Sequence, residues 1–200
     1  MATSAGTGSP IRAIELVGLP GTGKSTVARC LESILRDAGM PIRSRPVVLA
    51  DQSWFMRRQQ VRLQLIARNV ARCGHLYRRA FDLIASSGQR SVMDFAVVMS
   101  NFWSIIALMT EGQAAEDLLT IADQGLLQAV WSVQLSSSKD LPLDAWAPLL
   151  LAAGVRGTLL VHVQSDIAVS RHRVSARPYS RTRLGFGTSQ ERSRQWQVAA

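Results

Sequence analysis

The spacing of Gly18, Gly23, Lys24 and Ser25 satisfies the pattern G-x-x-x-x-G-K-[ST]. Glycines allow backbone N–H groups to turn toward phosphate oxygens, and the start of a helix adds partial positive charge. In this pattern the lysine reaches the β- and γ-phosphates of a nucleoside triphosphate, and the serine binds Mg²⁺. An ordinary glycine turn is the alternative. We predict that ATP and Mg²⁺ bind here, with nucleotide contacts from Gly18, Pro20, Gly21, Thr22, Gly23, Lys24, Ser25 and Thr26.

Asp123 follows the apolar stretch 118–122, where a carboxylate can support Mg²⁺ beside a phosphate-binding loop. We therefore predict that Ser25 and Asp123 are the metal-binding residues. A turn-forming aspartate before Gly125 is the alternative. The next residue is Gln124, where many ATP hydrolases carry glutamate, and this difference favours phosphoryl transfer to a substrate over hydrolysis.

Two further aspartates follow predicted strands. Asp51 comes after the predicted strand 42–50, and Asp94 lies at the end of the predicted strand 90–95. Ligands of open α/β sheets bind at the carboxyl ends of the strands, so both carboxylates are expected in one site. Asp94 is the candidate that orients or deprotonates the hydroxyl of an acceptor substrate, because kinases use an aspartate for this step. A helix N-cap is the alternative role for Asp94.

The segment that begins at Asp51 combines aromatic and basic residues. Trp54 and Phe55 could stack a planar acceptor, and Arg58 could hold its anionic group. With Asp94, these residues form the predicted acceptor-binding set. The alternative is that Phe55 belongs to the core and that the arginines cover the surface.

Alternating β and α patterns predict an α/β fold, a three-layer sandwich with a mostly parallel central sheet. The predicted strands are 11–17, 42–50, 90–95, 118–122 and 158–163. The predicted helices are 24–38, 53–73, one that ends near 87–88, one containing 101–109, a short one among the loops marked by 136–138, Pro142 and Pro148, and 166–177.

The chain has 200 residues and a net charge of +9, which comes mainly from arginine. Length and composition predict one globular domain over 11–200, and an arginine-rich surface suits anionic partners. Residues 1–10 lack the features of a signal peptide and are predicted to be a flexible tail. The uncharged stretch 95–109 is about four residues short of a membrane span and is predicted to be buried. We expect a cytoplasmic protein without a membrane partner.

The stretch GLPGTGKST resembles the loop of P-loop kinases of the nucleoside and nucleotide kinase group, which includes thymidylate kinase, adenylate kinase and small-metabolite kinases. The stretch VHVQSDIAVSRHRVSARPYSRTRL is similar to that group's strand, helix and lid. The resemblance implies a P-loop NTPase fold and a lid over about 171–187, with Arg173, Arg177 and Arg181 as catalytic residues alongside Lys24. Thymidylate kinases commonly have Asp-Arg where this chain has Asp94 and a phenylalanine, which argues against a thymidylate substrate.

Together these features predict an ATP-dependent kinase that transfers the γ-phosphoryl group to a nucleoside, a nucleotide or a similar metabolite. A kinase of an antibiotic, a sugar or a polynucleotide end would have the same loop and lid. A non-catalytic, nucleotide-dependent regulatory module that binds nucleic acid through the +9 charge is the alternative from another class. The sequence leaves the donor base and the oligomeric state open, with a homodimer among the options.

Overall fold

The computed structural model describes residues 11–43, 55–114, 118–176 and 196, and for 55–58, 113 and 114 it describes the backbone alone. The strands of this part are β1 (Ala13–Val17), β2 (Ile42–Arg43), β3 (Leu119–Ala122) and β4 (Thr158–His162). Its α-helices are α1 (Lys24–Asp37), α3 (Phe55–Arg68), α4 (Val70–Ser86), α5 (Val92–Ala114), α6 (Leu126–Gln134), α7 (Leu143–Ala152) and α8 (Ile167–Ser175), and a 3₁₀ turn, η1, spans Val155–Gly157.

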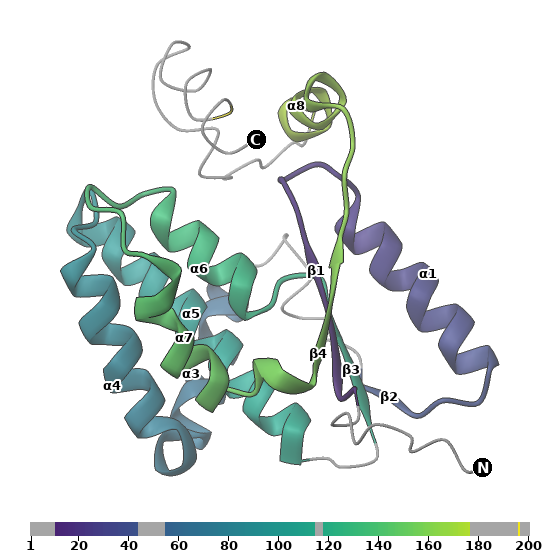
Figure 1. The fold of residues 1–200 in the computed structure, drawn as a ribbon, viewed down its shortest axis with the longest axis horizontal. Helices are drawn as coiled ribbons and strands as arrows, with labels where there is room; N and C mark the ends of the chain where they lie inside the picture. The colour runs from purple at the N-terminus through teal and green to yellow at the C-terminus, as the bar shows by residue number, and fades with distance from the viewer. Residues whose placement is uncertain (1–10, 44–54, 115–117, 177–195, 197–200) are drawn as a thin grey trace, which may run out of the picture.

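The four strands form one parallel sheet in the order β2-β3-β1-β4. In β1, Ile14 lies opposite Ile121 of β3 and Leu159 of β4. Helix α1 covers one face of the sheet, and α3 to α7 lie on the other face (Figure 1). The predicted α/β fold with a parallel sheet is therefore confirmed.

Alternation along β1 explains why helices cover both faces of the sheet. Ile14 and Leu16 are buried and pack with Ile121 against the apolar side of α1. Ala13 packs instead with the residues of the helical layer. Because successive side chains of a strand point to opposite faces, both faces of β1 are buried. The central strand is thereby fixed between two apolar layers.

Helix α5 is the centre of the helical layer. Val98, Phe102, Ile106 and Met109 are buried in one cluster with residues of α3, α4, α6 and α7. Phe102 contacts Trp146 of α7, with ring centroids 5.6 Å apart. In the described part of the chain, α5 is the helix that is long and apolar enough to cross a membrane by length and composition. Many of its apolar residues form protein core, as predicted for the stretch 95–109.

The predicted strand 90–95 is wrong, because this segment enters α5. The Ser91 hydroxyl accepts a hydrogen bond from the backbone N–H of Asp94 at 3.0 Å, as a helix N-cap residue does. A short apolar run is compatible with a strand or with a buried helix, and periodicity alone does not separate the two. In this segment the serine cap accompanies the helical outcome.

The predicted helix 53–73 is interrupted at Asn69, which separates α3 from α4. Its side-chain amide donates to the carbonyl of Leu65 at 2.9 Å and to Glu111 at 2.7 Å. An asparagine that bonds nearby backbone competes with helix continuation.

Two other predicted elements also differ from the structure. The single short helix predicted around Pro142 and Pro148 is in fact two helices, α6 and α7, with Pro148 inside α7. Of the predicted strand 42–50, only residues 42 and 43 are described.

Glu111 joins β2 to the helical layer. Its carboxylate accepts hydrogen bonds from Arg43 at 2.6 Å, from Arg68 at 2.9 Å and from Asn69 at 2.7 Å. Partial burial acts to raise the pKa of Glu111, but these hydrogen bonds outweigh it and lower the pKa. The cluster therefore links β2, the α3–α4 junction and α5 through one charged side chain.

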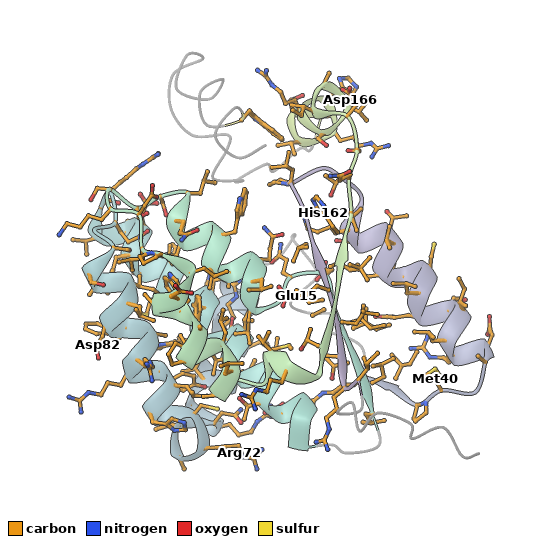
Figure 2. All side chains as sticks on the ribbon, in the orientation of Figure 1. Glu15, Met40, Arg72, Asp82, His162 and Asp166 are labelled. Carbon is orange, nitrogen blue, oxygen red and sulfur yellow. The ribbon has the colours of Figure 1, made fainter. Side chains whose placement is uncertain are left out.

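Helix α8 follows the carboxyl end of β4 and lies beyond the end of the sheet (Figure 1). Asp166 caps it by accepting hydrogen bonds from the backbone N–H groups of Ala168 and Val169, at 2.7 and 3.3 Å (Figure 2). Val174 and Trp196 are buried together, and Leu19 packs against them. Helix α8 therefore lies against the loop that follows β1.

Glu15 of β1 is fully buried, on the face that looks toward α6 (Figure 2). Its Oε1 accepts a hydrogen bond from the backbone N–H of Gln128 at 2.9 Å. Burial is the largest effect on this carboxyl and raises its pKa, although backbone hydrogen bonds from Gln128, Leu127 and Leu126 act in the opposite direction. A carboxylate from a strand thus lies at the start of α6, where its negative charge interacts favourably with the partial positive charge of the helix N-terminus.

Glu15→Gln should change how stability depends on pH. Because the pKa of Glu15 is raised in the folded state, its contribution is fully present below the usual value of 4.5 and is lost as pH rises through the raised pKa. The wild type should therefore lose stability relative to Glu15→Gln as pH rises above 4.5. Urea unfolding of both proteins across this range measures the difference. A difference that stays constant with pH would contradict the burial effect.

Candidate functional site

The carboxyl ends of β1 and β3 lie where the connections of the sheet diverge. Strand β1 leads into α1 on one face, and β3 leads into α6 on the opposite face (Figure 1). Open parallel sheets bind ligands at such a point, beyond the carboxyl ends of the strands. Residues 18–25, which we call the glycine-rich loop, follow β1, and Asp123 follows β3. Topology therefore places both predicted features at the same edge of the sheet.

Ser25 and Asp123 meet at this edge of the sheet. The Ser25 hydroxyl donates a hydrogen bond to Oδ2 of Asp123 at 2.7 Å, although 98 positions separate them in the chain. Mg²⁺ prefers oxygen ligands and commonly takes one or two from protein, with the others from water and phosphate. The described residues contain no group of three or more His, Cys, Asp or Glu side chains that could hold a metal. Ser25 and Asp123 offer two oxygens, which fits a Mg²⁺ site whose other ligands come from water and phosphate.

The glycines of the loop are required by close packing. Gly18 has a φ of 146° and Gly21 a φ of 87°, which side-chain-bearing residues rarely adopt. A Cβ on Gly18 would overlap the carbonyl oxygen of Val163, and one on Gly21 would overlap that of Ser170. The loop therefore packs closely against the backbone of the segments that follow β4.

The side chain of Lys24 makes hydrogen bonds within the loop. Its ammonium donates to the carbonyl oxygens of Gly18 at 2.5 Å and Leu19 at 2.8 Å. The Thr22 hydroxyl donates to the same Leu19 carbonyl at 2.9 Å. Helix α1 begins at Lys24, so the partial positive charge of its N-terminus adds to the ammonium. Positive charge and backbone N–H groups are thus concentrated beside Ser25.

Arg173 approaches the loop from α8. Its Nη1 donates to the carbonyl oxygen of Gly21 at 3.4 Å, and it is the side chain nearest to where a Cβ of Gly23 would be. The structure therefore brings one of the three predicted lid arginines to the loop. Arg177 and Arg181 lie outside the described residues.

Asp94 does not lie at the end of a strand. It is in the first turn of α5, where its backbone N–H and its carboxylate both contact the Ser91 hydroxyl, at 3.0 and 3.3 Å. Ser91, three residues before Asp94, is therefore the N-cap of α5. The helix-cap alternative for Asp94 is not borne out, and its expected position at the sheet edge is wrong. Phe95, where thymidylate kinases commonly have arginine, packs edge-on against Phe81 with ring centroids 5.6 Å apart. A general-base role for Asp94 stays a prediction, but the strand-end position on which that prediction was based is absent.

The predicted acceptor-binding residues are largely outside the described part of the chain. Asp51 and Trp54 precede the start of α3 and are not described. Phe55 and Arg58 belong to the first turn of α3, where the structure describes the backbone alone. Their roles remain predictions.

Sequence reasoning missed two residues that contact the loop or its support. Oε1 of Gln128 accepts a hydrogen bond from the backbone N–H of Gly18 at 3.1 Å. Glu15 holds the backbone N–H of the same glutamine from the other side. An acidic residue inside an apolar strand was the available signal for Glu15, because buried charges need partners. Gln128 carried no comparable signal.

No family model, curated protein or solved structure matches this chain.

The predicted metal site requires that Asp123→Asn weaken Mg²⁺-dependent binding of a nucleoside triphosphate by roughly tenfold or more, because the charge that faces Ser25 is lost. Calorimetric titration with a non-hydrolysable ATP analogue, with Mg²⁺ and with EDTA, measures this part. Asp140→Asn, which removes an exposed carboxylate beyond α6, is the matched control. Equal Mg²⁺ dependence in both variants would contradict the metal assignment.

Proposed function

We propose that this protein binds a nucleoside triphosphate with Mg²⁺ at the glycine-rich loop and transfers its γ-phosphoryl group to a small acceptor. The observation that carries the proposal is the hydrogen bond between Ser25 and Asp123 beside Lys24, at the carboxyl ends of β1 and β3. A hydroxyl and a carboxylate at this position, next to an ammonium and a helix start, suit a metal-bound triphosphate. This arrangement supports a P-loop NTPase fold.

In the proposed reaction an acceptor hydroxyl oxygen forms a bond to the γ-phosphorus, while the bond from this phosphorus to the β–γ bridging oxygen breaks. The nucleoside diphosphate leaves, and the hydroxyl proton passes to solvent or a base. Bound Mg²⁺ would neutralise charge on the phosphate oxygens. Lys24 would exchange the carbonyls of Gly18 and Leu19 for phosphate oxygens, and Arg173 would face the transferring group from α8.

Transfer is favoured over hydrolysis by the residues around Asp123 and the glycine-rich loop. Gln124 follows Asp123 and is exposed, so this position offers no carboxylate to activate water. Arg173 can add positive charge where the transition state carries negative charge. The acceptor we propose is a nucleoside, a nucleotide or a similar small metabolite.

A nucleotide-dependent module that binds nucleic acid is the second candidate. Helix α4 lies on the outer side of the helical layer and exposes Arg72, Arg78 and Arg79 (Figure 1). Such a basic face suits a phosphate backbone. This candidate requires DNA or RNA affinity that falls steeply with salt and no labelled small acceptor.

Lys24→Ala should reduce phosphoryl transfer by at least about a hundredfold while the fold is retained, since the hydrogen bonds of this lysine to Gly18 and Leu19 hold the loop and not the core. The assay incubates the protein with γ-labelled ATP and a panel of nucleosides, nucleotides and sugars. Lys139→Ala, which removes the exposed second lysine of the chain, is the control. A folded Lys24→Ala protein with the wild-type rate would refute the proposal, as would wild-type protein that labels no acceptor.

Arg173→Ala should lower the rate of transfer by roughly tenfold or more and change nucleotide affinity less, because its charge is proposed to act mainly on the transition state. Arg171→Ala removes an exposed arginine of the same helix and should keep the wild-type rate. Rate constants and nucleotide affinities of the two variants provide the comparison. Equal rates would assign Arg173 to the solvated surface.

A further inference from the structure

Gln128 connects three parts of the molecule through two hydrogen bonds. Its backbone N–H donates to Oε1 of Glu15 on β1 at 2.9 Å. Its side-chain Oε1 accepts from the backbone N–H of Gly18, the first residue of the glycine-rich loop, at 3.1 Å. Since Gln128 lies in the first turns of α6, it joins the central strand, this helix and the loop.

Gly18 is held from both of its polar groups. Gln128 accepts from its N–H, and Lys24 donates to its carbonyl oxygen at 2.5 Å. In the proposed function Lys24 turns from this carbonyl to phosphate, so its hold on Gly18 ends when nucleotide binds. Gln128 occupies the N–H of Gly18. In this proposal the phosphates take the N–H groups of the loop residues that follow Gly18, and the contact from Gln128 persists.

We propose that Gln128 is a positioning residue that holds the start of the nucleotide-binding loop while Lys24 is engaged with phosphate. The inference rests on the proposed function and adds a residue to its site. Gln128 does not touch the nucleotide in this proposal. It acts through Gly18, whose φ of 146° and contact with Val163 leave the loop little freedom to adjust.

The same helix start also positions Asp123. Only Gln124 and Gly125 separate Asp123 from α6, and the carboxylate of Glu15 fills the space where a side chain of Gly125 would lie. Glu15 thus fixes the beginning of α6, and with it the distance between the metal-facing carboxylate and the residue that holds Gly18. One buried carboxylate aligns the loop after β1 with the loop after β3.

Gln128→Leu is the decisive variant, because leucine has similar volume and removes the acceptor. A backbone N–H left without its partner costs enough to weaken nucleotide binding by about ten- to a hundredfold. The probes are Mg²⁺ with a non-hydrolysable ATP analogue, and inorganic tripolyphosphate, both measured by calorimetry. With turnover, the KM for ATP should rise by the same factor while kcat changes less.

Gln134→Leu is the matched control. Gln134 ends the same helix, and its side-chain amide donates to the carbonyl of Leu141 at 2.7 Å, so this variant also loses one hydrogen bond to backbone. Both variants should show similar losses in unfolding midpoint. Amide exchange of Gly18, followed by NMR, should accelerate in Gln128→Leu alone.

The outcomes separate this inference from the proposed function. Weaker binding of both probes together with faster exchange at Gly18, in Gln128→Leu alone, supports a positioning role. Wild-type affinity in a folded Gln128→Leu protein would overturn the positioning role and leave the proposed function standing. Equal loss of affinity in Gln134→Leu would also overturn it, because the effect would then be general destabilisation. A wild-type protein that binds neither probe would overturn both proposals.

Discussion

The parallel pairing of β1 with β3 on one side and β4 on the other is the constraint on which the rest of the structure depends. Since the three strands run in one direction, their carboxyl ends emerge at the same edge. The glycine-rich loop then has the segment after β3 beside it, where Ser25 meets Asp123, and the segment after β4 behind it, where Val163 backs onto Gly18. Each of these contacts follows from the strand order.

In addition to the sheet, helices α6 and α8 make contacts that hold the loop in place. Helix α8 contributes Arg173 above Gly21, and Leu19 packs against Val174 and Trp196. Helix α6 contributes Gln128 beneath Gly18. The loop is therefore shaped by elements that lie more than a hundred residues away in the chain, and its polar interior is left to Lys24, Ser25 and backbone N–H groups.

The loop and Asp123 could be predicted because their signals are local: a fixed glycine spacing after an apolar strand, and an acid at the end of another. Asp94 was misplaced because a short apolar run fits a strand or a helix. The spacing of Ser91 and Asp94, S-x-x-D before an apolar run, was a sequence signal for the helix start that the structure shows. The bond from Gln128 to Gly18 spans 110 positions and follows no sequence period, so neither pattern nor propensity could reveal it.

The burial of Glu15 beneath the start of α6 has a consequence for how this sequence can change. The carboxylate occupies the volume in which a side chain of Gly125 would lie. A larger residue at position 125 is therefore compatible with the fold only when a smaller one stands at position 15, and the reverse exchange leaves a void. The two positions thus share one volume in the core, although they lie far apart in the chain.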